Sequence, residues 1–130
     1  MEVPPMRKLS PTTESFYIPE MRLVNPCNNR QHWRVVSKRA KEQRQWTCFY
    51  MNAFNSSWPI HPPKGIKVTL VRIGKRKMDT DGLAASFKAV RDGVADFFKR
   101  DDGSDFFEWC YTQKIEKYYG VEIRIEAREA

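Results

Sequence analysis

Acidic side chains gather in one part of a chain that is otherwise basic. Asp79 and Asp81 flank Thr80, and the pair Asp101 and Asp102 follows one predicted helix later. Carboxylates suit Mg²⁺, and a few suffice because the ion keeps several waters and takes phosphate oxygens as further ligands. Two such ions could activate water and stabilise a leaving 3′ oxygen. These acids predict a metal site for phosphodiester hydrolysis, although an isolated Asp-x-Asp is more often a cap or a turn.

Lys88 lies on the helix that is expected to begin near Asp81. On one continuous α-helix, Lys88 and Asp92 each fall within about 20° of Asp81. A lysine beside metal-bound carboxylates could contact the scissile phosphate or neutralise charge in the transition state. The plainer interpretation is a surface ion pair between Lys88 and Asp92. Asp92 is then either a further metal ligand or only that partner.

The charge distribution indicates a polyanionic substrate. Residues 1–78 carry fifteen Lys or Arg against four acids, whereas residues 79–108 carry eight acids against four bases. A basic surface attracts phosphates, and carboxylates hold the cations that bridge protein to phosphate. The pattern favours a metal-dependent enzyme that acts on nucleic acid. A solvated surface of mixed charge is the alternative.

Two basic groups are the candidate DNA-binding residues. Trp33 is expected to stack on an unpaired base, whereas Trp46 falls on the apolar face of its predicted helix and is expected in the core. The candidates for contact with DNA are Arg30, Trp33, Arg34, Lys38, Arg39 and Lys41, in a run that extends to Arg44, and Lys75, Arg76 and Lys77 directly before Asp79.

Other classes of function find little support. No stretch of 18 or more apolar residues is present, which excludes a membrane helix. Cys27, Cys48 and Cys110 lie far apart without metal-ligand spacing, which argues against a disulfide framework or a zinc site and favours a reducing cytoplasm. The chain has no nucleotide-binding or serine-nucleophile motif. His32 and His61 are too isolated to favour acid–base catalysis without a metal.

The elements that must position these residues form one small α/β (α+β) domain over residues 14–130, after a flexible tail over residues 1–13. Hydrophobic periodicity predicts strands at residues 15–18, 66–73, 106–112 and 121–126 and helices at residues 34–54 and 81–98, in the order β-α-β-α-β-β. The second helix would be about 27 Å long. Asp101 or Asp102 can therefore join Asp79 and Asp81 only if the chain doubles back, or if the helix stops near Gly93.

Four motifs, in this order, resemble those of the RusA-type Holliday junction resolvases of bacteria and their phages. They are NPCNNRQHWRV at residues 25–35, DTDGL at 79–83, KAVRDGV at 88–94 and the pair at 101–102. The resemblance covers residues 24–126. It implies a mixed sheet flanked by helices and a homodimer. It also implies an Mg²⁺-dependent endonuclease, for which Mn²⁺ can substitute, that nicks two opposed strands of a four-way DNA junction.

By position, the resemblance implies that Asp79, Asp81 and Asp102 are the catalytic metal ligands, with Asp101 as the alternative to Asp102. Lys88 is the most plausible counterpart of the family's catalytic lysine, although it lies further from Asp81 than in the enterobacterial form. An isologous dimer suits a four-way junction, which has approximate two-fold symmetry.

A second departure from the family is Gly82, which stands where the pattern usually has Asn. The expected location is the cytoplasm of a bacterial or phage-infected cell, and no membrane and no nucleotide cofactor are expected as partners. The alternatives are a broader flap or branch nuclease, a nucleic-acid-binding module without catalysis, and a protein-interaction factor without affinity for DNA.

Overall fold

The structure, a computed structural model, describes residues 7–10, 13–24, 33–54 and 65–128 of the 130 residues. Cys27, Arg30, His32 and His61, and most of the motif at residues 25–35, lie outside these ranges. Within them the strands are β1 (Arg7–Ser10), β2 (Thr13–Pro19), β3 (Ile66–Gly74), β4 (Phe107–Ile115) and β5 (Gly120–Ala127), and the helices are α1 (Trp33–Phe54), α2 (Thr80–Ser86) and α3 (Lys88–Phe98).

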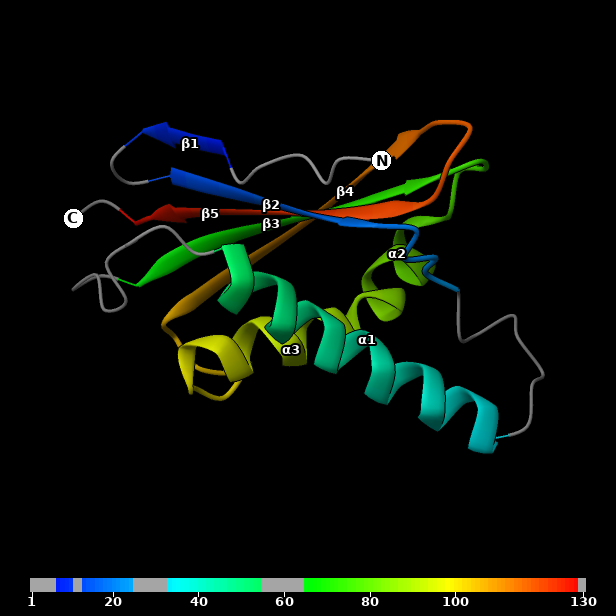
Figure 1. Cartoon of the computed structure of the whole chain (residues 1–130), viewed down its shortest axis with the longest axis horizontal. Coiled ribbons are helices and arrows are strands. Elements are labelled where there is room, and N and C mark those ends of the chain that lie inside the picture. The colour runs from blue at the N-terminus through cyan, green and yellow to red at the C-terminus, as the bar shows by residue number, and fades with distance from the viewer. Residues whose placement is uncertain (1–6, 11–12, 25–32, 55–64, 129–130) are drawn as a thin grey trace.

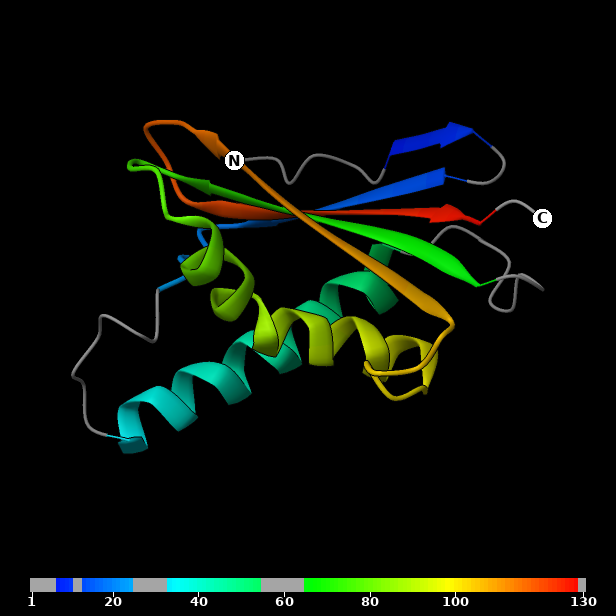
Figure 2. The same cartoon turned by 180° about the vertical axis from the view of Figure 1, so that it is seen from behind.

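The strands form one mixed sheet in the order β1-β2-β5-β3-β4, and the helices lie on one of its faces (Figure 1). β3 and β4 are parallel and are connected by α2 and α3 (Figure 2), whereas the other neighbouring pairs are antiparallel. The predicted mixed α/β class is confirmed. The order of elements differs from the prediction, because β1 precedes the first predicted strand and lies within the segment predicted as a tail.

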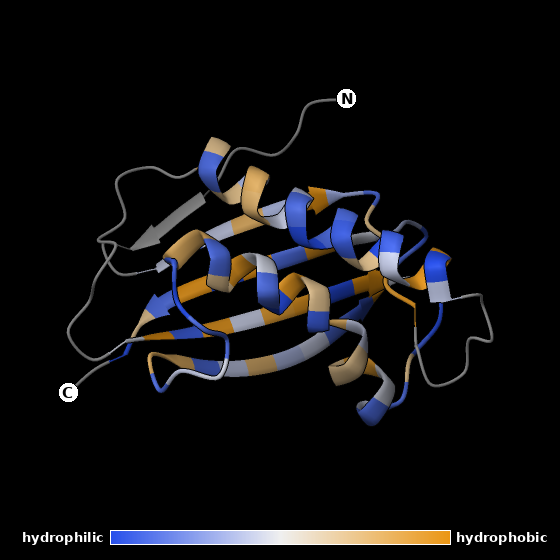
Figure 3. Ribbon diagram, turned by 90° about the horizontal axis from the view of Figure 1, so that it is seen from below, coloured by the Kyte–Doolittle hydropathy of each residue, from blue (hydrophilic) through white to orange (hydrophobic). Residues whose placement is uncertain are grey.

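Alternating residues of the central strands build the core. Ile66, Val68 and Leu70 of β3 are fully buried, and β5 places Ile123 and Ile125 beside Leu70 and Val68. Successive side chains of a strand point to opposite faces, so these residues form one apolar layer beneath the helices. Figure 3 shows this layer behind α1, whose first turns are mostly hydrophilic.

The predicted helix over residues 81–98 is two helices, which meet at Phe87. Phe87 is fully buried, and its ring stacks on Tyr111 of β4 with centroids 5.7 Å apart. Its backbone (φ −89°, ψ 0°) leaves ideal helical geometry, and the Ser86 hydroxyl donates to the carbonyl of Leu83. The predicted single helix is therefore wrong. Burial of the aromatic ring and this local hydrogen bond both compete with a continuous helix.

Helix α1 packs on α3 through a close approach at Gly93. A Cβ on Gly93 would lie 2.6 Å from the carbonyl oxygen of Arg44 and from Cβ of Thr47, so a larger residue would push the helices apart. Thr47 and Met51 are the buried residues of α1. The helix therefore contacts the core along a narrow line and leaves most of its surface exposed.

Trp46 is not in the core, contrary to the prediction. Its side chain is 51% exposed and packs edge-on against Phe49, with centroids 5.5 Å apart. The prediction failed because the buried line of α1 runs through Thr47, one residue further along the helix. The periodicity identified a helix but placed its buried face about one residue away from the observed one.

Candidate functional site

Asp79 and Asp81 stand at the start of α2, at the end of the sheet where β3 finishes. Asp79 is the N-cap: its Oδ1 accepts a hydrogen bond of 2.8 Å from the backbone N–H of Gly82. Asp81 lies in the first turn, where the helix dipole favours a carboxylate. Both residues are exposed. Their carboxylates are therefore accessible to a metal ion, whether the ion binds alone or together with a phosphate.

A polar group beneath this turn fixes the approach to Asp79. On the helix-covered face, β3 contributes Arg72 and β4 contributes Gln113, and the two residues are register partners. Arg72 donates through Nη1 to the carbonyl of Arg76 at 2.7 Å and to Oε1 of Gln113 at 3.2 Å. Gln113 in turn bonds to both backbone polar groups of Met78. Residues 76–78 are thus anchored to two strands immediately before the cap.

Lys88, at the first position of α3, holds two carboxylates together. Its Nζ lies 3.0 Å from Oδ1 of Asp92 and 3.0 Å from Oδ2 of Asp102. These hydrogen bonds raise the pKa of Lys88, and the Lys88 ammonium lowers the pKa of Asp102. The chain doubles back to bring Asp102 here: α3 runs past Gly93 and ends at Lys99, which adopts the left-handed conformation (φ 56°).

The two members of the acidic pair have different surroundings. Asp102 lies 3.2 Å from Nη2 of Arg91, and its backbone carbonyl accepts a hydrogen bond of 2.9 Å from the indole N–H of Trp109. Asp101 is exposed and accepts from the backbone N–H of Gly103 within its own turn. Of the pair, Asp102 is the member that joins Lys88 and Asp92.

The stripe predicted for Asp81, Lys88 and Asp92 holds only in part. Lys88 and Asp92 form the expected i,i+4 ion pair on α3. Asp81 lies on α2, on the other side of the break at Phe87, so the angle calculated for one continuous helix does not apply to it. The break changes the orientation of the acidic start of α2 relative to Lys88.

A groove of about 790 Å³ runs between α1 and the α2–α3 segment. Arg39 and Lys41 line it from α1, and Lys88 and Asp92 line it from α3. Small side chains on both sides leave the space open; they are Ala40, Ala84, Ala85 and Ala89. Two of the predicted DNA-binding residues and the predicted catalytic lysine therefore share one groove.

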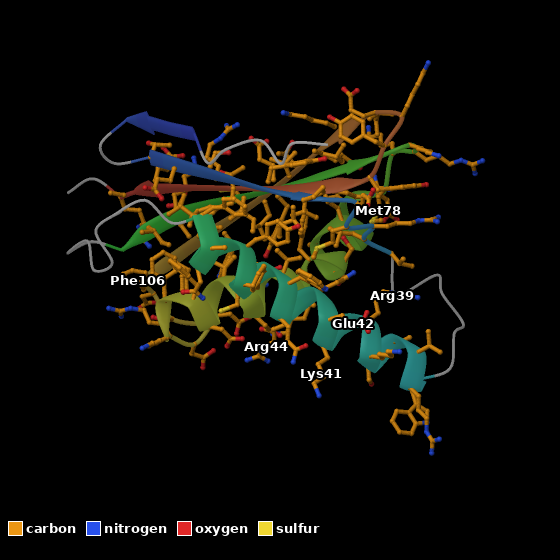
Figure 4. All side chains as sticks on the ribbon, viewed as in Figure 1. Arg39, Lys41, Glu42, Arg44, Met78 and Phe106 are labelled. Atoms are coloured by element: carbon orange, nitrogen blue, oxygen red, sulfur yellow. The ribbon has the colours of Figure 1, made fainter. Side chains whose placement is uncertain are left out.

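The other predicted DNA-binding residues that the structure describes lie in two separate places, on α1 and in the turn before α2. Trp33 is 66% exposed at the start of α1, and the guanidinium of Arg34 lies over its ring at 5.3 Å. Lys38 forms an exposed ion pair with Glu42. The second basic group, Lys75, Arg76 and Lys77, is exposed in the turn before α2. Figure 4 shows Lys41 and Arg44 extending from α1 and Met78 near the end of the sheet.

Sequence reasoning missed the ion pair that joins α1 to α3. Arg44 donates through Nε and Nη2 to both carboxylate oxygens of Asp96, at 2.6 and 2.8 Å. Its Nη1 also lies 4.0 Å from Asp92, which links this pair to the Lys88 group. Periodicity could place each residue on a helix surface but gave no signal that the two helices would face each other there.

The donor chemistry fits Mg²⁺, although the predicted ligands are not gathered into one group. Among the described residues, no three His, Cys, Asp or Glu side chains lie together as a ready cation site. Asp79 and Asp81 both lie at the start of α2, whereas Asp92 and Asp102 lie around Lys88. Mg²⁺ is commonly held by one or two carboxylates together with waters and substrate phosphates. The exposed pair at α2 meets that minimum.

Searches against protein-family models and against curated proteins find no match to this chain. None of the described helices combines the length and the apolar composition that crossing a membrane requires.

Proposed function

We propose that this protein is an Mg²⁺-dependent endodeoxyribonuclease of the RusA type that nicks opposed strands of branched DNA. In this reaction water attacks the phosphorus of one phosphodiester and the bond to the 3′ oxygen breaks. The support comes from the ordered motifs of the sequence together with the groove between α1 and α3. The observation that carries the proposal is the position of Lys88, which holds Asp92 and Asp102 at 3.0 Å each on a wall facing a basic helix.

The chain's own residues divide the work between the two carboxylate pairs. Arg39 and Lys41 attract the DNA backbone into the groove, where Lys88 presents a positive charge to a phosphate. Asp79 and Asp81 would hold Mg²⁺ together with waters and phosphate oxygens, whereas Asp102 lies apart from them, with Lys88 and Asp92. Bound there, the ion would supply Lewis-acid stabilisation of the attacked phosphate.

We further propose that two copies act together. Paired nicking requires two active sites related by a two-fold axis, because the opposed strands of a four-way junction are so related. Sedimentation with and without a junction measures this directly. A protein that cuts both strands while remaining one chain per junction would contradict the dimer.

The decisive test of the function is incubation with a synthetic four-way junction, with Mg²⁺, with Mn²⁺ and with EDTA. We expect paired nicks with either metal and none with EDTA. The variant Asp81→Asn should still bind the junction but no longer cut it, whereas Asp105→Asn, which removes another exposed carboxylate, should cut normally. Metal-dependent cutting by Asp81→Asn would remove Asp81 from the mechanism. Flap and duplex substrates run alongside distinguish a junction resolvase from a broader branch nuclease.

A second function, DNA binding without catalysis, is favoured by one observation. Asp92 and Asp102 are neutralised by Lys88 and Arg91, and Asp79 caps a helix, so these acids have structural partners without any metal. This function predicts binding of DNA that is indifferent to Mg²⁺ and no cleavage with any divalent ion. The junction assay above separates the two.

A further inference from the structure

We propose that Arg22 and Lys75, which both lie over the ring of Tyr119, bind one phosphate group of the DNA backbone together with the buried Arg72. The identification of the ligand as DNA rests on the proposed function. The presence of the cation cluster does not rest on that function, because it follows from contacts and charges within the fold. The site lies at the end of the sheet where β3 leaves for α2, outside the groove described above.

Three segments that are distant in sequence meet at this site. The guanidinium carbon of Arg22 lies 4.8 Å from the centroid of the Tyr119 ring, and Nζ of Lys75 lies 5.4 Å from it. The backbone N–H of Glu20 donates to the carbonyl of Tyr119 at 3.0 Å, which ties the segment carrying Arg22 to the turn between β4 and β5. Arg22 is therefore held near the sheet end by backbone structure as well as by its contact with the ring.

Arg72 is a buried cation without an acidic partner among the described residues. It is only 7% exposed, and the hydrogen bonds of its Nη1 go to two neutral oxygens, those of Arg76 and Gln113. Burial lowers the pKa of Arg72; the interaction with Tyr119 opposes this effect, and repulsion by Arg22 adds to it. A buried charge usually has a counter-ion, because desolvation is otherwise uncompensated.

The contrast with other arginines strengthens this assignment. Arg44, Arg91 and Arg124 each lie within 4.0 Å of a carboxylate, on Asp96, Asp102 and Glu122 respectively. Within the described residues, neither Arg22 nor Lys75 forms such an ion pair, although both are exposed and lie over the ring of Tyr119. Among the described residues, none of these three cations has a carboxylate within ion-pair distance, and a phosphate would provide a negative charge for them.

The site also lies next to the turn that leads from β3 to the acidic start of α2. Lys75 opens the turn that continues through residues 76–78 to Asp79, and Arg72 supports that turn through the carbonyl of Arg76. A DNA phosphate bound at Tyr119 would place the DNA strand beside Asp79 and Asp81. Binding here would therefore orient DNA toward the carboxylates as well as add affinity.

The test compares Arg22→Gln, Lys75→Gln and the double variant, because both side chains are exposed and their loss spares the buried Arg72. The control is Lys114→Gln, which removes a cation of β4 that already pairs with Glu122 at 3.5 Å. Junction affinity is measured in EDTA over a series of KCl concentrations. Each single variant should weaken binding, and the double variant should reduce the slope of log K against log [KCl] by about 1, not about 2, since both cations serve one phosphate.

If the double variant shows the same slope of log K against log [KCl] as the Lys114→Gln control, the proposed phosphate site is wrong. A second arm titrates inorganic phosphate while NMR follows the ring signals of Tyr119. Saturable shifts that disappear in the double variant, with unchanged DNA slopes, would assign the site to a free anion and overturn its assignment to DNA. If the wild-type protein cuts no junction but the slopes change as expected, the phosphate site stands and the nuclease function fails.

Discussion

The side-chain amide of Gln113 is hydrogen-bonded to both backbone polar groups of Met78. Its Nε2 donates to the Met78 carbonyl at 2.7 Å, and its Oε1 accepts from the Met78 N–H at 3.0 Å. β4, an edge strand of the sheet, thereby fixes the backbone of Met78, the residue that precedes Asp79, through both its N–H and its carbonyl. The position of the acidic start of α2 thus depends on a residue from the far side of the βαβ connection.

Replacing Gln113 with Met should free this turn. The substitution keeps the side-chain length but removes both hydrogen bonds to Met78 and one acceptor of Arg72, at a cost of about 1–3 kcal/mol in unfolding free energy. The amide of Met78 should exchange faster with solvent in NMR hydrogen exchange. Thr112→Val, on the exposed face of the same strand, is the control. Unchanged exchange at Met78 would contradict the anchoring role.

Two substitutions at Asp79 separate its cap from its charge. Asn is also a good N-cap residue, so Asp79→Asn should keep the stability of α2, whereas Asp79→Ala should cost about 1 kcal/mol. Both should lose metal-dependent cleavage if the carboxylate binds the ion. Thermal unfolding and the junction assay measure the two effects. Full cleavage by Asp79→Asn would show that the charge is not used.

Removal of the Lys88 charge should affect cleavage more than folding. Lys88→Met leaves Asp92 and Asp102 without their shared cation, and loss of one electrostatic contact to a reacting phosphate lowers kcat by about 10²–10³. Lys88→Arg should retain part of the rate because it keeps the charge. Lys117→Met, in the exposed turn after β4, is the matched control. A rate equal to that of the control would leave Lys88 with only its ion-pair role.

Gly93 should be essential for the contact between α1 and α3. An alanine Cβ there would meet backbone and side-chain atoms of α1 at 2.6 Å, and such overpacking costs about 1–3 kcal/mol. Gly103→Ala is the control, because its Cβ would meet only a side-chain oxygen at 3.8 Å. The measurement is the unfolding free energy in urea. Equal stability of the two variants would argue against close helix packing.

The ion pair between Arg44 and Asp96 should make stability depend on pH in acid. The hydrogen bond from Arg44 lowers the pKa of Asp96 below its ordinary value of 3.8. The stabilisation is therefore fully present above 3.8 and is lost as the pH falls through the lowered value. Because both side chains are partly exposed, it amounts to less than about 1 kcal/mol. Asp96→Asn should lower Tm at about pH 6 but hardly at about pH 2; equal losses at both would contradict this.

The sequence predicted those elements whose residues carry a clear local pattern. The strand at Ile66 and the helix that begins near Trp33 have strong periodicity and clear ends, and both were found. The break at Phe87 and the exposure of Trp46 depend on which residue faces the sheet, which is decided by packing between elements. A periodic pattern alone cannot supply that choice.

The candidate site was predictable to a similar extent. The pairing of Lys88 with Asp92 follows from helical spacing and is present. The return of Asp102 to Lys88 required a left-handed residue at Lys99, which no turn signal marked, since Lys seldom adopts that conformation. The hydrogen bond between the buried Arg72 and the half-buried Gln113 was missed because each residue appears, on its own, to be an ordinary polar side chain of a strand.

The position of β5 has a consequence for synthesis of the chain. β5 is the last of the described strands in sequence, yet it lies between β2 and β3, and its Glu126 pairs with Thr13 of β2. Without β5, the described strands would fall into two pairs, β1–β2 and β3–β4, because no other strand joins β2 to β3. Assembly is therefore late and long-range, which makes slow refolding and dependence on chaperones an expected property of this fold.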